Sequence, residues 1–318
     1  YSSFCSKIFL FDNGSTDSTL QKASKFKKVK VINFDTGGKK NNKYHSYIKS
    51  EEYKNYSRKG GQFTEEVADW IICVDSDELI YHPRILDVLA EYDLDGVTVP
   101  QITGFNIVGE KELTDSPSII DQYDMAVREP IFDKRAVFKC SFNMPNSPGC
   151  HPYGPAFKYM QEMHDYKTSN KHKLALLHYK HIGSRLLETA KTNLSRFDET
   201  QITRNEKGHY EGPGAQYKFY IEADLKKSYL IRDGKSLFKN GRDINFDSFT
   251  ETTGESGALI QGSPYILDSE VDELICIVDK ICKEFKTEAS KLLSFMYKHR
   301  PENKKIENAI VKQKDLKE

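Results

Sequence analysis

Apolar runs alternate with an amphipathic stretch along the first third of the chain. Short apolar runs occur at residues 7–11, 29–34 and 70–74, and a helix-like stretch at 18–26 separates the first two. Continuous apolar runs of this length are typical of strands that are buried on both faces of a sheet. The pattern therefore predicts a doubly wound α/β domain.

The middle of the chain continues this pattern with longer loops. An amphipathic helix is predicted from Ile85, a strand at 96–102, and a further strand at 174–177 that runs into His178 and Tyr179. Residues 185–197 again have a helical pattern. We place the end of the first domain near residue 203.

Beyond residue 203 the organisation changes. The segment 204–263 carries eight glycines and is predicted to be a loop-rich excursion. Apolar residues then recur at steps of three and four over 269–299, which predicts a long helix within a C-terminal extension, 264–318. We expect this helix to pack on the body of the protein, with a homodimer or partner contact as the alternative. The charged tail after Pro301 is expected to be frayed.

Charge and hydropathy argue against several classes of protein. The 318 residues include 47 basic and 47 acidic side chains, so no net charge attracts nucleic acid or an anionic membrane. The Lys-, Asn- and Tyr-rich stretch at 36–62 is interpreted as a surface helix between glycine turns rather than a nucleic-acid patch. No apolar run approaches the roughly 20 residues that a transmembrane helix needs.

The cysteines indicate a reducing environment. They form no CxxC pair and lie in apolar or helix-like sequence, at Cys5, Cys73, Cys140, Cys150, Cys276 and Cys282. This usage is typical of reduced, buried thiols, with disulfides as the alternative. We therefore expect a cytoplasmic protein, and peripheral attachment to a membrane stays open.

Two carboxylates follow the apolar run at 70–74, in "WIICVDSDE". Residues two apart in an extended chain point to the same side, so Asp75 and Asp77 are expected to converge. Adjacent carboxylates repel one another, and we expect a cation to compensate them. Oxygen ligands of this kind suit Mg²⁺ or Mn²⁺. The alternative is that both aspartates only cap a following helix.

Two further apolar runs end in polar side chains. Asp12 closes the first in "FLFDNGSTD", and His178 closes the last in "LALLHY". Ligands of open α/β sheets bind outside the carboxyl ends of the strands. We therefore expect Asp12, the Asp75 and Asp77 pair, and His178 to face one metal and nucleotide site.

Taken in order, "IFLFDNGSTDSTL", "ADWIICVDSDELI" and "ALLHY" with a basic helix after it resemble the GT-A fold glycosyltransferases of the glycosyltransferase 2 type. The resemblance spans roughly residues 7–200. It implies a GT-A-like, Rossmann-like mixed sheet flanked by helices, forming a catalytic domain over 1–203. Members of the family usually have one more strand, bearing an Asn-Glu pair, and none precedes the "DNGSTD" strand here.

The resemblance also implies roles for single residues. Asp12 would contact the nucleoside with Asn13 in the adjoining turn, and Asp17 would stabilise the helix start. Asp75 would contact the ribose or a metal-bound water, and Asp77 and His178 would ligate the metal. Glu78 would orient these groups. The diphosphate would meet cations from the basic stretch that follows the histidine: Lys180, His181, Arg185, Lys191 and Arg196.

An inverting transferase also needs a carboxylate to deprotonate its acceptor. The acidic candidates are Glu129, Asp133, Glu162 and Asp165, and their spacing does not select one. The candidates we carry forward are Asp165, Glu162 and His151, the last because "PNSPGCHPYGP" resembles a histidine-bearing loop of the family.

The function expected from this resemblance is metal-dependent transfer of a sugar from a nucleotide-sugar, with a UDP-sugar favoured and Mn²⁺ or Mg²⁺ as cofactor. The acceptor would be a hydroxyl of a glycan, a glycolipid or a protein. One alternative is an inactive carbohydrate-binding or scaffold protein. A second is a nucleotidyltransferase, although no glycine-rich basic phosphate loop follows the first strand.

Overall fold

The computed structural model describes most of the chain, and all structural statements below concern its described residues. These are residues 1–39, 42–58, 67–115, 118–146, 160–163, 165–183, 186–197, 202–204, 210–212, 214–222, 234–249, 271–272, 275, 278, 286–299 and 303–315. His151 and Arg185, both candidate site residues, lie outside them, as do Cys150, Cys276 and Cys282.

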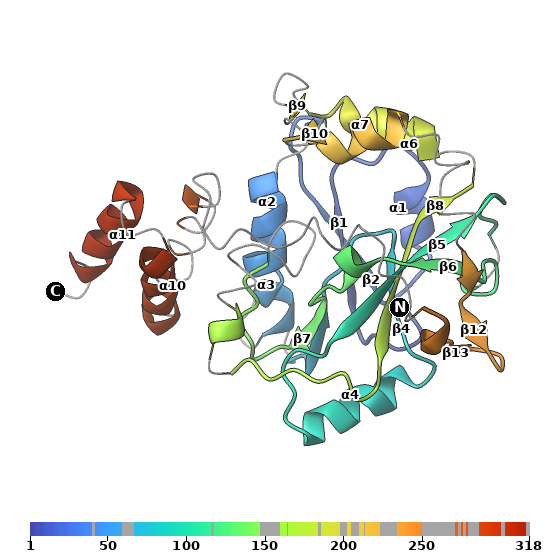
Figure 1. Ribbon diagram of the computed structural model, residues 1–318, viewed down its shortest axis with the longest axis horizontal. Coiled ribbons are helices and arrows are strands. Elements are labelled where there is room, and N and C mark those ends of the chain that lie inside the picture. The colour runs from blue at the N-terminus through green and yellow to red at the C-terminus, as the bar shows by residue number, and fades with distance from the viewer. Residues whose placement is uncertain are drawn as a thin grey trace.

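A mixed sheet of five strands forms the centre of the fold (Figure 1). Its spatial order is β11 (Lys235–Ser236), β6 (Met125–Arg128), β5 (Ile102–Gly109), β8 (Leu174–Ile182) and β4 (Glu78–Tyr81). Strands β5 and β8 are parallel, whereas the other neighbours are antiparallel. The expected mixed α/β architecture is therefore confirmed, and the segment 204–263 contributes an edge strand, β11, to this sheet. The doubly wound arrangement predicted from the apolar runs at 7–11, 29–34 and 70–74 is wrong, because the strands formed there pair outside this sheet.

Four shorter strand pairs surround the central sheet. The parallel pair joins β1 (Ile8–Asp12) to β2 (Val29–Asn33), and an antiparallel pair joins β3 (Trp70–Ile72) to β7 (Val137–Lys139). Two minor hairpins complete the set: β9 (Thr203–Arg204) with β10 (Tyr210–Glu211), and β12 (Phe238–Lys239) with β13 (Asp243–Ile244).

Helices flank the sheet. In the view of Figure 1, α4 lies below it, α6 and α7 lie above it, and α10 and α11 lie beyond α2 and α3. The helical bounds are α1 (Thr19–Ala23), α2 (Asn42–Tyr47), the π-helical η1 (Ile48–Glu52), α3 (Lys54–Ser57), α4 (Ile85–Leu94), the 3₁₀ turn η2 (Pro130–Phe132), α6 (Leu186–Leu194), α7 (Ala215–Glu222), the 3₁₀ turn η5 (Phe246–Phe249), α10 (Lys286–His299) and α11 (Lys304–Asp315). Among the described helices, none combines the length and apolar character needed to cross a membrane.

Strand β8 shows how the sequence covers both faces of the sheet. Side chains alternate between the two faces of a strand, so Leu174 and Leu176 point one way and Ala175 and Leu177 the other. Leu174 and Leu176 pack in one cluster with the α4 side chains Val88 and Tyr92. Ala175 and Leu177 belong to a second cluster, which includes Phe105, Leu237 and Phe249. All these apolar side chains are buried.

The strand predicted at 96–102 is wrong in position, because β5 starts only at Ile102. Residues 98–101 instead bond irregularly to a neighbouring loop, with the amides of Thr98 and Val99 sharing the Lys167 carbonyl at 2.8 and 3.1 Å. Pro100 has no amide hydrogen and cannot donate to a regular ladder. The apolar pattern at 96–102 therefore indicates that its apolar residues are buried, and it does not indicate a strand.

The prediction of a frayed tail after Pro301 is also wrong. Helix α11 occupies Lys304–Asp315, and its Ile306 is fully buried. Ile306 shares a hydrophobic cluster with Leu292 and Met296 of α10 and with Phe138 of β7. One apolar stripe suffices to dock a helix whose other residues are charged. This cluster also confirms that the α10 face packs on the body of the protein.

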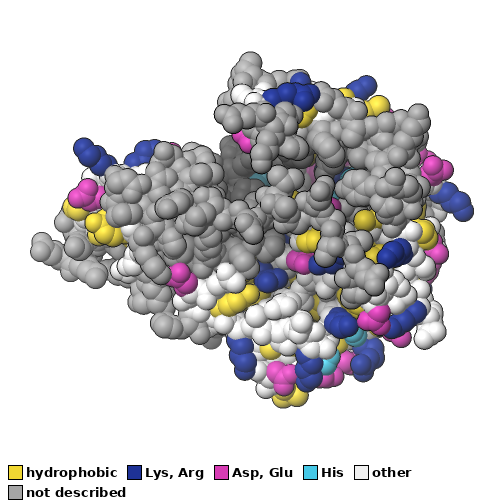
Figure 2. Space-filling view, viewed as in Figure 1, with side chains coloured by type: hydrophobic (Ala, Val, Ile, Leu, Met, Phe, Trp, Pro, Cys, Tyr) yellow, Lys and Arg dark blue, Asp and Glu magenta, His cyan; other side chains and the backbone are white. Residues whose placement is uncertain are grey.

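The surface carries mixed charge where it is described. Figure 2 shows Lys and Arg side chains interspersed with Asp and Glu over the region of α4. There Lys171 pairs with Asp95 at 3.0 Å. Among the described cysteines, Cys5, Cys73 and Cys140 form no disulfide.

Candidate metal centre

Three polar residues form a row across the central sheet. Glu78 of β4 and Asn106 of β5 are both register partners of His178 in β8. Directly paired residues on neighbouring strands present their side chains on the same face. All three are buried, at 4%, 3% and 4% exposure. Buried polar groups need partners, so this row has to form its own hydrogen bonds.

The hydrogen bond of His178 fixes the tautomer of its ring. Nδ1 lies 2.8 Å from Oδ1 of Asn106. An amide oxygen only accepts, so Nδ1 carries a proton in this contact and Nε2 is the nitrogen that remains to bind a metal ion. The Phe132 ring lies over the imidazole with 4.1 Å between centroids. Nε2 is directed to Asp77, whose Oδ2 is 3.5 Å away.

The turn between β3 and β4 holds the two aspartates. The amide of Glu78 donates to the Asp75 carbonyl at 3.1 Å, and the Asp75 amide donates to Oε2 of Glu78 at 3.2 Å. The Tyr179 amide donates to the Asp77 carbonyl at 2.8 Å, which ties the turn to β8. Strand β4 follows directly, so the alternative that these aspartates cap a following helix is wrong.

Strand β8 does not end at the histidine as predicted but continues to Ile182. Its register with β5 shifts after His178, because Asn106 pairs with His178 whereas Val108 pairs with His181. Bulges of this kind redirect side chains and are frequent next to active sites. Here the irregularity falls at Tyr179 and Lys180.

Lysines supply positive charge around the carboxylates. Lys134 is fully buried, pairs closely with Glu78, and has Nζ 3.9 Å from Oδ2 of Asp75. Lys49 of η1 pairs with Oδ1 of Asp75 at 2.7 Å. Burial lowers the pKa of Lys180, against the opposing charges of Asp77 and Asp75. Three carboxylates thus lie among three lysines.

Asp77 is anionic despite its surroundings. Burial acts to raise the pKa of Asp77, but the hydrogen bond and charge of His178 outweigh it and hold the pKa below its ordinary value. Its side chain is still 41% exposed. An accessible carboxylate and an imidazole nitrogen that releases its proton when a metal binds are a suitable pair of donors for a divalent cation.

The donor set fits such an ion. One oxygen or nitrogen atom each from Asp77, Glu78 and His178 lies within 4.8 Å of the others. Adjacent ligands of an octahedral ion with bonds of about 2.1 Å lie about 3.0 Å apart. The 3.5 Å between Asp77 and His178 is close to that spacing. Glu78 is the weaker donor because it already pairs with Lys134.

Asp12 and Asn13 lie at the end of the separate β1–β2 pair. Oδ2 of Asp12 accepts hydrogen bonds from the amides of Gly14 and Ser15, both at 3.1 Å. Asn13 bonds to Thr36 through its side chain, with Nδ2 2.9 Å from Oγ1. These contacts shape the turn, and the carboxylate of Asp12 is buried in it.

The candidate catalytic carboxylates are not all near this centre. Glu162 and Asp165 are exposed, and the Asp165 carbonyl accepts from Thr98 at 2.6 Å, at the opposite end of β5 from Asn106. The contact of Asp165 therefore lies at Thr98, before the start of β5, and not at Asp77 or His178. Lys191 is exposed in the last turn of α6.

Glu129 is the acidic candidate whose pKa is affected by the charge of His178. It precedes η2, and its amide donates to the Gly104 carbonyl at 3.1 Å. Burial raises the pKa of Glu129 above the usual range, opposed in part by the charges of Arg128 and His178. Asp133, the fourth candidate, accepts from the Gly104 amide at 2.8 Å and therefore has a structural role.

Three members of this centre were missed by sequence reasoning: Lys49, Lys134 and Asn106. Asn106 carried a usable signal, because it is a lone polar residue in the apolar run "ITGFNIVG". Lys49 and Lys134 lie 26 and 56 residues from the carboxylates that they contact, in polar sequence. Ion pairs between residues so far apart in the sequence produce no local sequence pattern that could predict them.

Comparison with protein-family models and with curated proteins gave no match. The chemistry of the site therefore has to indicate the function. Its arrangement can bind a divalent cation through one carboxylate and one imidazole, next to lysines that can pair with an anion.

Proposed function

We propose that the protein is a metal-dependent glycosyltransferase, which transfers a sugar from a nucleotide-sugar to a hydroxyl group. The observation that carries this proposal is the pairing of Asp77 with an imidazole whose proton is held on the far nitrogen by Asn106. The order of the "DNGSTD", "DSDE" and "HY" motifs supports it. We favour a UDP-sugar donor and a glycan, glycolipid or protein acceptor.

Asp77 and His178 would hold the cation, Mn²⁺ or Mg²⁺, with Glu78 completing the set or fixing the turn. When bound, the ion would neutralise charge that develops on the departing diphosphate. Lys180 lies within the field of Asp77 and Asp75 and adds a fixed positive charge for the same anion.

We propose Glu129 as the residue that accepts the proton of the acceptor hydroxyl. A carboxylate with a raised pKa is a better base near neutral pH than an ordinary glutamate. The Glu129 amide is held on β5 by the Gly104 carbonyl, and the turn η2 that follows places Phe132 over the His178 ring.

A binding screen tests the proposal. UDP-, GDP-, CMP- and dTDP-sugars are added with and without Mn²⁺, and the melting temperature is measured, because a ligand that binds only the folded state raises it. We expect one donor class to raise it, and only with Mn²⁺. Asp77→Asn and His178→Ala should lower donor hydrolysis by about 100-fold or more. Asp121→Asn is the matched control, since this exposed carboxylate pairs with Arg242 away from the centre.

The products separate the alternatives. Release of a nucleoside diphosphate supports a glycosyltransferase, whereas release of pyrophosphate would indicate a nucleotidyltransferase. No stabilisation by any donor, with Mn²⁺ present, would contradict the proposal and favour a scaffold protein.

A further inference from the structure

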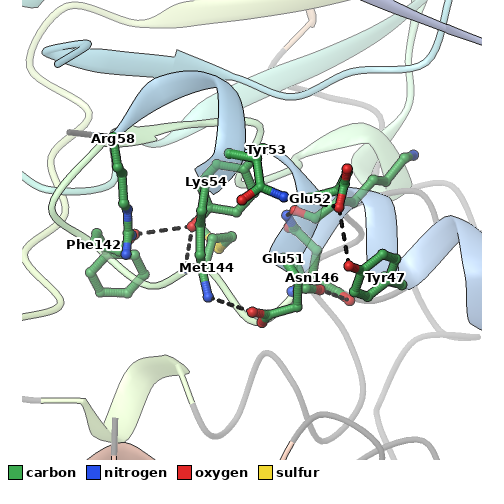
Figure 3. Close-up of polar contacts among 12 residues, drawn as sticks. Tyr47, Glu51, Glu52, Tyr53, Lys54, Arg58, Phe142, Met144 and Asn146 are labelled. Carbon is green, nitrogen blue, oxygen red and sulfur yellow. Dashed lines mark hydrogen bonds and ion pairs between the residues drawn. The ribbon is translucent and has the colours of Figure 1, made fainter. Parts of the chain in front are cut away.

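The helical segment that carries Lys49 is rigidly attached to the body of the protein. Figure 3 shows its polar contacts with the chain around Phe142, Met144 and Asn146. Nδ2 of Asn146 donates to the Lys49 carbonyl at 2.6 Å, and Oγ of Ser50 lies 3.1 Å from the Asn146 amide. Ser50 and Asn146 are almost completely buried. The backbone of Lys49 is therefore fixed, and its position can change only through its long side chain.

The π-helical geometry of η1 directs this side chain. One π-helical stretch, Ile48–Glu52, separates α2 from α3. Short π-helical insertions are rare and are frequently found at functional sites, because they change the direction of side chains within a helix. In this case Lys49 meets Asp75, whereas Lys54, one turn further, pairs with Glu51 of its own segment.

The Lys49–Asp75 pair is asymmetric in its exposure. The Lys49 side chain is 11% exposed, but that of Asp75 is 46% exposed. The carboxylate therefore faces solvent at the metal centre, and the lysine reaches it from the protein side. Nζ of Lys134 lies 3.9 Å from Oδ2, the second carboxylate oxygen of Asp75. Asp75 keeps one positive neighbour even when Lys49 moves.

Two of the three carboxylates at the centre are paired with lysines without a metal ion. Asp75 pairs with Lys49, and Glu78 pairs with Lys134. A divalent cation alone would bring two positive charges against the single negative charge of Asp77, which is unfavourable in a partly buried site. A cation that arrives with a diphosphate brings a compensating negative charge.

We propose that Lys49 is a movable counter-ion, which neutralises Asp75 in the ligand-free protein and turns to the diphosphate when metal and nucleotide bind together. This inference rests on the proposed function and adds a coupling between its two ligands. Lys49 cancels the negative charge of Asp75 beside the metal ligands, so free metal binds weakly. Nucleotide draws Lys49 away from this carboxylate and restores its charge, and each ligand therefore strengthens the binding of the other.

Lys49→Met tests this role by calorimetric titration of Mn²⁺ alone and of UDP in the presence of Mn²⁺. The substitution frees Asp75 and removes a cation from the diphosphate. We expect the affinity for Mn²⁺ alone to rise about tenfold and the affinity for UDP to fall about tenfold, the usual worth of one charged hydrogen bond. Lys49→Arg should keep both values near those of the wild type.

Lys54→Met is the matched control, because Lys54 is equally enclosed in the same segment but pairs with Glu51. It should leave both affinities within about twofold of the wild type. Opposite shifts in Lys49→Met support the proposal, since a purely structural role would weaken both ligands together. Parallel losses, or no change in either affinity, would overturn it.

Failure of the proposed function would give a different experimental result from failure of the Lys49 proposal. If wild-type protein does not bind UDP or any other nucleotide with Mn²⁺, the glycosyltransferase proposal fails. The titration of Mn²⁺ alone still decides whether Lys49 weakens metal binding by neutralising Asp75, because it needs no nucleotide.

Discussion

At the scale of single residues, the two aspartates of the centre differ in the side chains that they contact. The sequence led us to expect a cation that compensates Asp75 and Asp77, and Lys49 and Lys134 supply positive charge at Asp75. Asp77 differs, because it faces Nε2 of His178. The structure thus separates two aspartates that looked equivalent in the "DSD" triplet.

The role of Asn106 gives a prediction at this scale. Asn106→Leu removes the acceptor for Nδ1 of His178, so the ring can rotate or change tautomer. We expect the affinity for Mn²⁺ in the presence of UDP to fall by about 10- to 100-fold, as for other residues that orient metal ligands. Calorimetric titration measures this, and nitrogen chemical shifts of His178 report the tautomer.

Asn106→Asp is the conservative control, since a carboxylate still accepts from Nδ1. It should retain both the tautomer with Nε2 unprotonated and most of the metal affinity. If Asn106→Leu lowered stability but bound Mn²⁺ as tightly as the wild type, a positioning role for Asn106 would be refuted.

The sequence predicted part of this site for a clear physical reason. Asp77 and His178 stand at the ends of apolar runs, and strand periodicity is a local property. The contacts that set their chemistry depend on pairing between distant strands, as Asn106 and His178 show across 72 residues. That register was not readable from either segment alone.

At the scale of elements, Gly104 positions the chain that covers the centre. A Cβ at this position would lie 2.4 Å from Cβ of Phe132 and 2.5 Å from its carbonyl carbon. The same segment carries Glu129 and leads into Lys134. Close contact between β5 and η2 therefore needs a residue without a side chain.

Gly104→Ala should destabilise the protein by about 1–3 kcal/mol, because overpacking forces η2 away from the sheet. Urea unfolding measures the free energy, and Thr103→Ala, its neighbour on β5, is the control. Adding Phe132→Ala should not restore stability, since the backbone of residue 132 is also in the way. Stability of Gly104→Ala within about 0.5 kcal/mol of the wild type would show that η2 does not need this contact.

Element predictions succeeded where burial and periodicity agree. The strands at 70–74 and 174–177 were recognised, although β3 is shorter and β8 longer than expected. The misplaced strand at 96–102 and the missed helix α11 have a common cause. Apolar spacing reports which residues are buried, and only tertiary contacts decide the backbone that buries them.

At the scale of the whole molecule, four distant parts of the chain meet at the candidate centre. The β3–β4 turn brings the carboxylates, β5 and β8 bring Asn106 and His178, and η1 brings Lys49. Helices α10 and α11 join the same cluster as Phe138 of β7, the strand paired with β3. The C-terminal extension thus packs on the body of the domain that holds the site.

Pulsed electron paramagnetic resonance of Mn²⁺ bound together with UDP tests the central claim most directly. The spectrum reports the nuclei next to the ion. We predict coupling to one imidazole nitrogen and to phosphorus of the diphosphate in the same complex, with the nitrogen signal lost in His178→Ala. A complex without nitrogen coupling, or one whose spectrum is unchanged in His178→Ala, would contradict the account.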